Sequence, residues 1–143
     1  MCLLIQGSRR VAKENIVCYK VLKECFEEGR ATPSHIRSAL FTHEWKLGKE
    51  YEAPRARWRP IYDSIYDGYF HSYKTLKDAF TDWHLQKPSD FNYRHIIYKC
   101  LIPKGSTYYY GIHDGGVEGY ASKRMKVVGY VNDDLPFGFT TNL

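Results

Sequence analysis

RHIIYKCLIP, at residues 94–103, is apolar on both alternating sets of its side chains. This composition suits a strand in the middle of a sheet, covered on both faces, better than an edge strand. Residues 16–23, IVCYKVLK, are rich in β-branched and aromatic side chains and predict a second strand. The two segments together indicate a fold built on a sheet.

Shorter extended segments flank these two strands. Residues 37–45, 108–112 and 125–131 have strand composition, and residues 49–51 predict a short edge after a turn at Gly48. Asp67-Gly68 is a turn signal, so residues 69–72 are expected to re-enter the sheet. Residues 54–60, PRARWRP, lie between two prolines and predict an exposed loop.

One helix is expected at residues 75–86. Thr75 and Asp78 form a plausible capping pair for its first turn. A single apolar stripe at helical spacing follows, made of Leu76, Ala79, Phe80 and Trp83. This stripe predicts that the helix packs on the sheet.

The predicted architecture is therefore α+β, a largely antiparallel twisted sheet of about five or six strands with one main helix on a face. The 143 residues match the usual size of one domain, so residues 1–143 are expected to form a single domain. Residues 132–143 mix Asp, Pro, Gly and Phe without period and predict a loosely ordered tail.

Composition gives the first indication of function. Aromatic residues make up 16% of the chain, with thirteen tyrosines, and the net charge of +5 favours anionic partners. No nucleic-acid-binding module signature accompanies the charge, so nucleic acid is not the expected partner. The oligomeric state is left open.

The sequence also indicates the compartment. The first residues, MCLLIQ, do not resemble a secretory signal, and no apolar run approaches the roughly 18 residues that span a bilayer, so a cytoplasmic protein is expected. The cysteines at positions 2, 18, 25 and 100 form no CxxC pair, and the six histidines form no HxH or HExxH pattern. Neither a metal nor a cofactor is expected.

Several segments together resemble a family of small uncharacterised proteins common in phages and in the bacteria they infect. They are MCLLI at 1–5, VCYKV at 17–21, GKEY at 48–51, FHSY at 70–73 leading into LKDA at 76–79, IPKG at 102–105 and YAS at 120–122. The resemblance implies a shared fold and a phage setting. It supplies no catalytic residue.

Three consecutive tyrosines are the first candidate site. Tyr108, Tyr109 and Tyr110 follow Lys104 and precede Gly115-Gly116. Aromatic faces stack on bases for about 1–3 kcal/mol each, and cations offset phosphate charge. A half-buried sheet also favours tyrosine without any ligand, which is the competing interpretation.

The loop at 54–60 is the second candidate. Arg55, Arg57 and Arg59 place three guanidinium groups beside Trp58, and arginine matches phosphate oxygens bidentately. A solvated basic loop that serves solubility is the alternative.

The third candidate is the junction before the helix. His71 and Ser72 lie where free N–H groups and the helix dipole attract anions. The alternative is that Ser72 and Thr75 cap the helix while His71 bonds a carbonyl.

These features favour a non-catalytic binding protein that captures an anionic, nucleotide-like ligand. The resemblance alone implies that it is of phage type and that the ligand is a signal such as one used in host defence. The order of segments also resembles an ADP-ribosyltransferase, with Lys20 at the basic position and Glu118 as the late acid, although Gly116 replaces its usual partner acid. A third hypothesis is a protein-interaction module that inhibits a host enzyme.

Overall fold

The structure is a computed structural model, and it describes residues 3–25, 35–38, 44–53, 64–65, 69–85, 93–113 and 115–131. The predicted basic loop at 54–60, the predicted tail at 132–143 and the middle of the predicted strand at 37–45 lie outside these residues.

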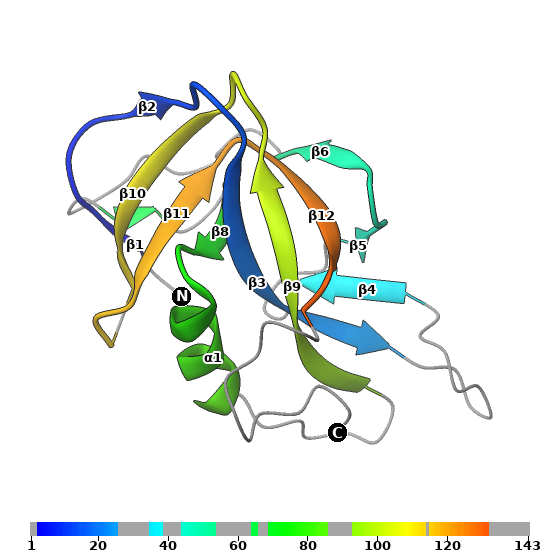
Figure 1. The fold of residues 1–143 in the computed structure, drawn as a ribbon. Helices are drawn as coiled ribbons and strands as arrows, with labels where there is room; N and C mark the ends of the chain where they lie inside the picture. The colour runs from blue at the N-terminus through cyan, green and yellow to red at the C-terminus, as the bar shows by residue number, and fades with distance from the viewer. Residues whose placement is uncertain are drawn as a thin grey trace.

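Within these ranges the chain forms twelve strands and one helix (Figure 1). The strands are β1 (Leu3–Ile5), β2 (Arg10–Val11), β3 (Ile16–Cys25), β4 (His35–Ser38), β5 (Glu44–Trp45), β6 (Glu50–Glu52), β7 (Ser64–Ile65), β8 (Phe70–Tyr73), β9 (Tyr93–Ile102), β10 (Thr107–His113), β11 (Glu118–Ser122) and β12 (Arg124–Tyr130). The helix is α1 (Leu76–Leu85). All the strand pairings among these residues are antiparallel, in the order β6-β12-β9-β3-β8-β11-β10-β1-β7. In addition, β2 pairs with β10, β4 pairs with β3, and β5 pairs with β4.

The pairing of β3 with β9 is the longest in the sheet. It runs without a break from Ile16↔Ile102 to Cys25↔Tyr93. β9 also pairs with β12 on its other side, which confirms the central strand predicted at 94–103, with observed bounds of Tyr93–Ile102. The strand predicted at 16–23 is confirmed as well and extends two residues further, to Cys25.

Side chains on the two faces of the β3–β9 pair enter different cores. One face carries Cys18 and Leu22 from β3 with Cys100 and Ile96 from β9 into the main core, where Trp45 and Phe70 also lie. The other face carries Val21 and Ile97 against α1. Both alternating sets of side chains are therefore buried, because other parts of the chain pack on each face of the β3–β9 pair.

The helix predicted at 75–86 is confirmed in position and capping, and the described part runs from Leu76 to Leu85, with residue 86 outside the described residues. The Thr75 hydroxyl accepts a hydrogen bond from the Asp78 N–H at 3.1 Å. Ala79 is fully buried, and Leu76 and Phe80 pack with it against β3 and β9. The side chain of Trp83 lies outside the described part.

Among the described helical residues, no segment is long and apolar enough to cross a bilayer.

The predicted fold class, α+β with five or six strands and a main helix, is wrong. The described residues form an almost entirely antiparallel β structure, to which a ten-residue helix is a small addition. Strands β1, β2, β7 and β11 were not predicted. β11 reads EGYAS and has no apolar alternation, because long-range packing requires small residues there.

Two glycines face each other across β10 and β11 and allow neighbouring groups to approach the backbone. Gly111 pairs with Gly119. A Cβ at Gly119 would lie 2.1 Å from Nε2 of His113 and 2.5 Å from the carbonyl oxygen of Ser72. The His113 ring lies over this glycine, with Nε2 at 3.2 Å from the Ser72 carbonyl oxygen. Packing of β11 against its neighbours therefore excludes any side chain at Gly119.

Replacing Gly119 with alanine is expected to destabilise the fold by about 1–3 kcal/mol, because the new methyl group has no room beside His113 and the backbone of β8. Urea unfolding measures the loss as a lower midpoint. Gly129→Ala in β12 is the matched control, since a Cβ there meets no atom within 4 Å. Equal midpoints for the two variants would contradict the packing described.

Candidate functional site

The three consecutive tyrosines are divided between the two faces of β10. Tyr108 and Tyr110 share one face, and Tyr109 lies on the other, where its ring is 5.7 Å from the ring of Tyr69. This division follows from the two-residue period of a strand. Tyr109 therefore does not join its neighbours in one site.

A third phenol completes the group on the Tyr108 side. Tyr120 of β11 stands opposite Tyr110, with ring centroids 6.1 Å apart, and 5.8 Å from the ring of Tyr108. All three rings are partly exposed. We call the surface formed by Tyr108, Tyr110 and Tyr120 the tyrosine face.

Two cations and one carboxylate surround Tyr110. The Arg10 guanidinium lies 5.6 Å from the centroid of the ring, and the Lys74 ammonium lies 5.5 Å from it. The Tyr110 hydroxyl donates to Glu118, which is also 3.8 Å from Lys74. The hydrogen bond to Glu118 is the main reason that the pKa of Tyr110 is raised. This end of the tyrosine face is held in place by its own charges.

Beside Tyr108 the surface opens into a hollow of about 830 Å³. Its walls come from β2, the connection to β3, the first residue of β3, and β10. The lining residues are Arg10, Val11, Lys13, Glu14, Asn15, Ile16 and Tyr108. One aromatic ring, two cations, a carboxylate and an amide therefore surround a single space.

Backbone hydrogen bonds fix the connection that forms the wall of the hollow. The N–H of Ala12 donates to the Ser106 carbonyl at 2.9 Å, and the N–H of Gly105 donates to the Ala12 carbonyl at 2.8 Å. Ala12 itself is buried in the main core. The charged residues on either side of Ala12 are thus presented from an anchored segment.

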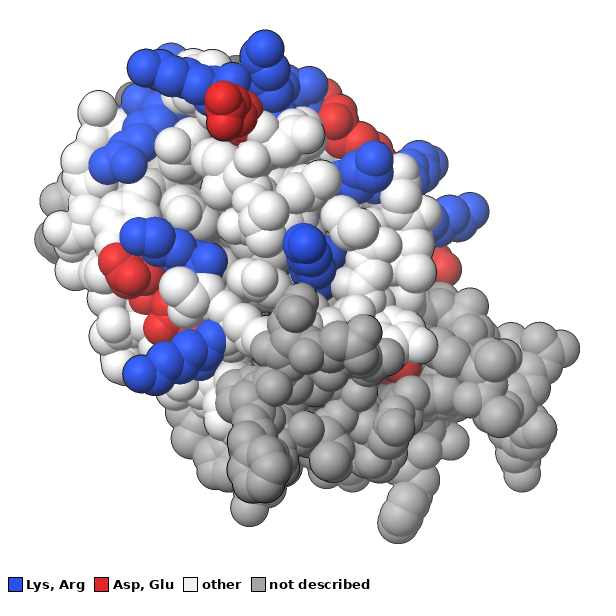
Figure 2. All heavy atoms as spheres, in the orientation of Figure 1, with Lys and Arg blue, Asp and Glu red and all other residues white. Residues whose placement is uncertain are grey.

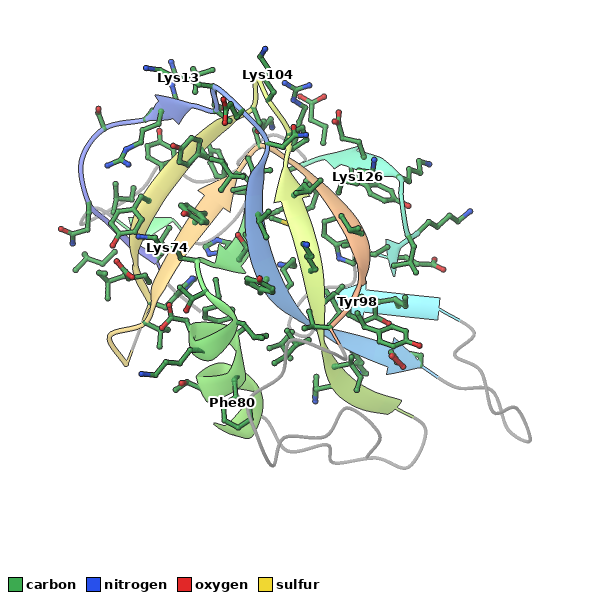
Figure 3. The ribbon with its side chains drawn as sticks, viewed as in Figure 1. Lys13, Lys74, Phe80, Tyr98, Lys104 and Lys126 are labelled. Atoms are coloured by element: carbon green, nitrogen blue, oxygen red, sulfur yellow. The ribbon has the colours of Figure 1, made fainter. Side chains whose placement is uncertain are left out.

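Cations gather at this end of the molecule. Figure 3 places Lys13 and Lys104 at the same end, above β2 and the β9–β10 turn. Figure 2 shows Lys and Arg side chains concentrated along that edge, with acidic groups between them. The N–H of Lys104 donates to Oδ1 of Asn15 at 2.9 Å, which ties the β9–β10 turn to the hollow.

The structure thus brings together only part of the predicted site. Tyr108 lines the hollow, and the Lys104 backbone is bonded to its wall. The predicted clamp of Arg55, Arg57, Trp58 and Arg59 lies outside the described residues. Arg10 and Lys13 were missed. The run RRVAK at 9–13, with three cations in five residues, was the available signal.

In β8, Ser72 is buried and His71 is half-buried. Ser72 is 1% exposed, and both ring nitrogens of His71 are buried without a hydrogen-bond partner. The His71 ring is 6.0 Å from that of His113. At the junction, the Asp78 N–H is already bonded to the Thr75 hydroxyl, so the two predicted residues are not arranged around an open anion site.

Lys20 and Glu118, the residues that suggested a transferase, form other contacts in the structure. The part-buried Lys20 ammonium donates to the carbonyl of His71 and lies 5.9 Å from the ring of Trp45, a residue of the main core. Glu118 accepts from Tyr110 and pairs with Lys74 at the edge of the tyrosine face. Lys20 and Glu118 thus have different partners, and the structure does not bring these two residues together in one open site.

Metal-ligating side chains do not cluster in the described part of the chain. No group of three or more His, Cys, Asp or Glu residues there is placed to hold a metal ion. Burial raises the pKa of the Cys18 thiol to about 11, and burial also raises that of Cys100. Both thiols are therefore protonated at neutral pH and are poor ligands and nucleophiles.

Comparison with known proteins adds no function. No family model, no curated protein and no solved structure matches the chain. The resemblance to small phage-type proteins therefore stays a prediction.

The buried His71 gives a prediction for pH dependence. Burial, with Lys20 and His113 nearby, lowers its pKa from 6.5 to about 3. Its folded-state pKa lies below the unfolded value, so the unfolded chain binds more protons below about pH 6.5. Stability is then complete above that pH and falls progressively towards pH 3.

The variant His71→Phe removes this titration and keeps a ring in place. Its advantage over the native chain should grow by about 1–2 kcal/mol between pH 7 and pH 5, measured by urea unfolding at both pH values. The native chain and the variant would lose stability in parallel if His71 were accessible to protons in the folded state.

Proposed function

We propose that this protein is a non-catalytic binding protein that captures an anionic, nucleotide-like ligand in the hollow beside Tyr108. One observation carries the proposal: the aromatic ring of Tyr108 lines the same space as the Arg10 guanidinium and the Lys13 ammonium, which come from a segment far from it in the sequence. A nucleotide requires this combination, because its base offers a flat face and its phosphate a charge.

The size and the chemistry of the hollow support the proposal. Ligand pockets for small molecules commonly measure about 300–1,000 Å³, and the hollow lies within that range. Val11 and Ile16 supply apolar surface on the wall, and Tyr108 supplies the ring on which a base would stack. Arg10 and Lys13 would receive the phosphate, with Arg10 able to bond two oxygens at once.

Binding is favoured over transferase chemistry by how Glu118, the late acid of the transferase hypothesis, is used. Glu118 accepts a hydrogen bond from Tyr110 and pairs with Lys74. It is therefore engaged in holding the tyrosine face. Capture of a host signal by a phage protein in the host cytoplasm is part of the proposal that rests on the sequence resemblance alone.

Binding is testable with purified protein and a panel of ADP, GDP and a cyclic dinucleotide. At 100 times its dissociation constant, a ligand adds about 2.7 kcal/mol of stability, so a bound nucleotide should raise the melting temperature by several degrees. Isothermal titration then gives the affinity. Tyr108→Leu should weaken binding about tenfold or more through lost stacking, and Arg10→Gln by a similar factor.

Lys99→Gln is the charge-matched control, because Lys99 is exposed on β9 and does not line the hollow. It should leave affinity within about twofold. If none of the nucleotides shifts the melting temperature, the proposal is wrong and an interaction module becomes the better hypothesis. Equal losses from Arg10→Gln and Lys99→Gln would mean that net charge, and not the hollow, attracts the ligand.

A further inference from the structure

The hollow contains an acid and an amide whose presence a phosphate and a ring do not explain. Glu14 and Asn15 are adjacent in the chain, both are exposed, and both line the hollow. We infer that these two side chains read the edge of a guanine base, so that the ligand is a guanine nucleotide. The inference rests on the proposed function and names the base that the same site would select.

The hydrogen bond of Asn15 fixes which end of its amide is available. Oδ1 accepts from the N–H of Lys104 at 2.9 Å. The amide nitrogen is therefore the group left to face a ligand, and it can only donate. A ligand edge beside Asn15 must then present an acceptor, such as a ring carbonyl.

Glu14 imposes the opposite requirement. An ionised carboxylate only accepts hydrogen bonds, through two oxygens. It would repel a phosphate, so the phosphate is expected near Arg10 and Lys13 and the carboxylate near the base. A carboxylate is best satisfied by two parallel donors, because charge-assisted bidentate pairs are the strongest polar contacts available.

Guanine meets both requirements along one edge. Its N1–H and its amino group are two adjacent donors for the Glu14 carboxylate, and its O6 is an acceptor for the Asn15 amide. Adenine and cytosine each offer only one amino group to the carboxylate, and uracil offers only one N–H. The arrangement of acceptor, donor and donor therefore selects guanine among the common bases.

The ribose is the competing partner for Glu14. The 2′ and 3′ hydroxyls are also two adjacent donors, and a carboxylate bound to them would not discriminate between bases. The two assignments differ in what they require of the ligand: base reading needs the guanine amino group, and ribose reading needs the 2′ hydroxyl. The guanine amino group and the 2′ hydroxyl can each be removed from the ligand separately.

The test uses the full chain and isothermal titration with GMP, IMP, AMP and dGMP. We expect GMP to bind at least about tenfold more tightly than AMP, because AMP loses one charge-assisted bond and leaves a carboxylate oxygen unpaired. IMP, which lacks only the amino group, should lose about fivefold or more. dGMP should match GMP within about twofold.

Glu14→Gln should reduce the preference for GMP over AMP to about threefold or less, with AMP affinity unchanged or improved by the lost negative charge. Glu52→Gln is the matched control, since Glu52 is exposed on β6 and does not line the hollow. It should retain the preference for GMP. Circular dichroism of each variant confirms that the fold is intact.

The outcomes separate this inference from the proposed function. If all four nucleotides bind equally and binding still depends on Arg10 and Tyr108, the hollow binds nucleotides and the guanine assignment is wrong. Equal GMP and AMP affinities with weak dGMP binding would assign Glu14 to the ribose and would also overturn the guanine assignment. Failure of every nucleotide to bind would reject both proposals together.

Discussion

The continuous antiparallel pairing of β3 with β9 is the constraint on which the rest of the molecule depends. Ten consecutive residue pairs hold these strands together, from Ile16↔Ile102 to Cys25↔Tyr93. A one-residue slip would exchange the set of side chains in the main core with the set under α1. Both sets are apolar, but they differ in size and in the residues that pack on them. Trp45 and Phe70 pack on one face, and Ala79 packs on the other. The β3–β9 pairing therefore determines where the helix and the remaining strands can pack.

The hollow depends on the same pairing at its upper end. Ile16, the first residue of the ladder, also lines the hollow, and Ala12 just before it is buried in the main core. The β9–β10 turn meets this connection through the Gly105 N–H and the Ser106 carbonyl, and the left-handed conformation of Gly105, with φ of +89°, lets the chain reverse there. Arg10 and Lys13 therefore project from a segment that is anchored by the hydrogen bonds of the Ala12 N–H and the Ala12 carbonyl. A site on anchored backbone requires less ordering when a ligand binds, which favours affinity.

Local composition was sufficient to predict the elements whose buried side chains follow a regular pattern. The central strand, the strand at 16–23 and the capped helix could all be predicted, because each carries its own periodicity or capping residues. β11 could not be predicted in this way. Gly119 must be small because His113 of β10 lies against it, and Ala121 is small where it packs with Leu3 of β1. The candidate site divides in the same way. Tyr108 was found from composition, whereas its approach to Arg10 comes from the pairing of β2 with β10, which joins segments almost a hundred residues apart and leaves no local pattern.

The polar groups inside the sheet explain why the candidate site lies at its rim. In the main core, the Tyr98 hydroxyl donates to Glu24 at 2.9 Å, and beside Trp45 of this core the part-buried Lys20 ammonium donates to the carbonyl of His71. Buried polar groups are costly unless they have hydrogen-bond partners. Each donor named here has a partner inside the protein, so these contacts stabilise the interior. At the rim, by contrast, Lys13 and Glu14 are exposed side chains on a fixed backbone. Selectivity for a charged ligand can develop there without disturbing the core, because exposed residues can change while the β3–β9 register is retained.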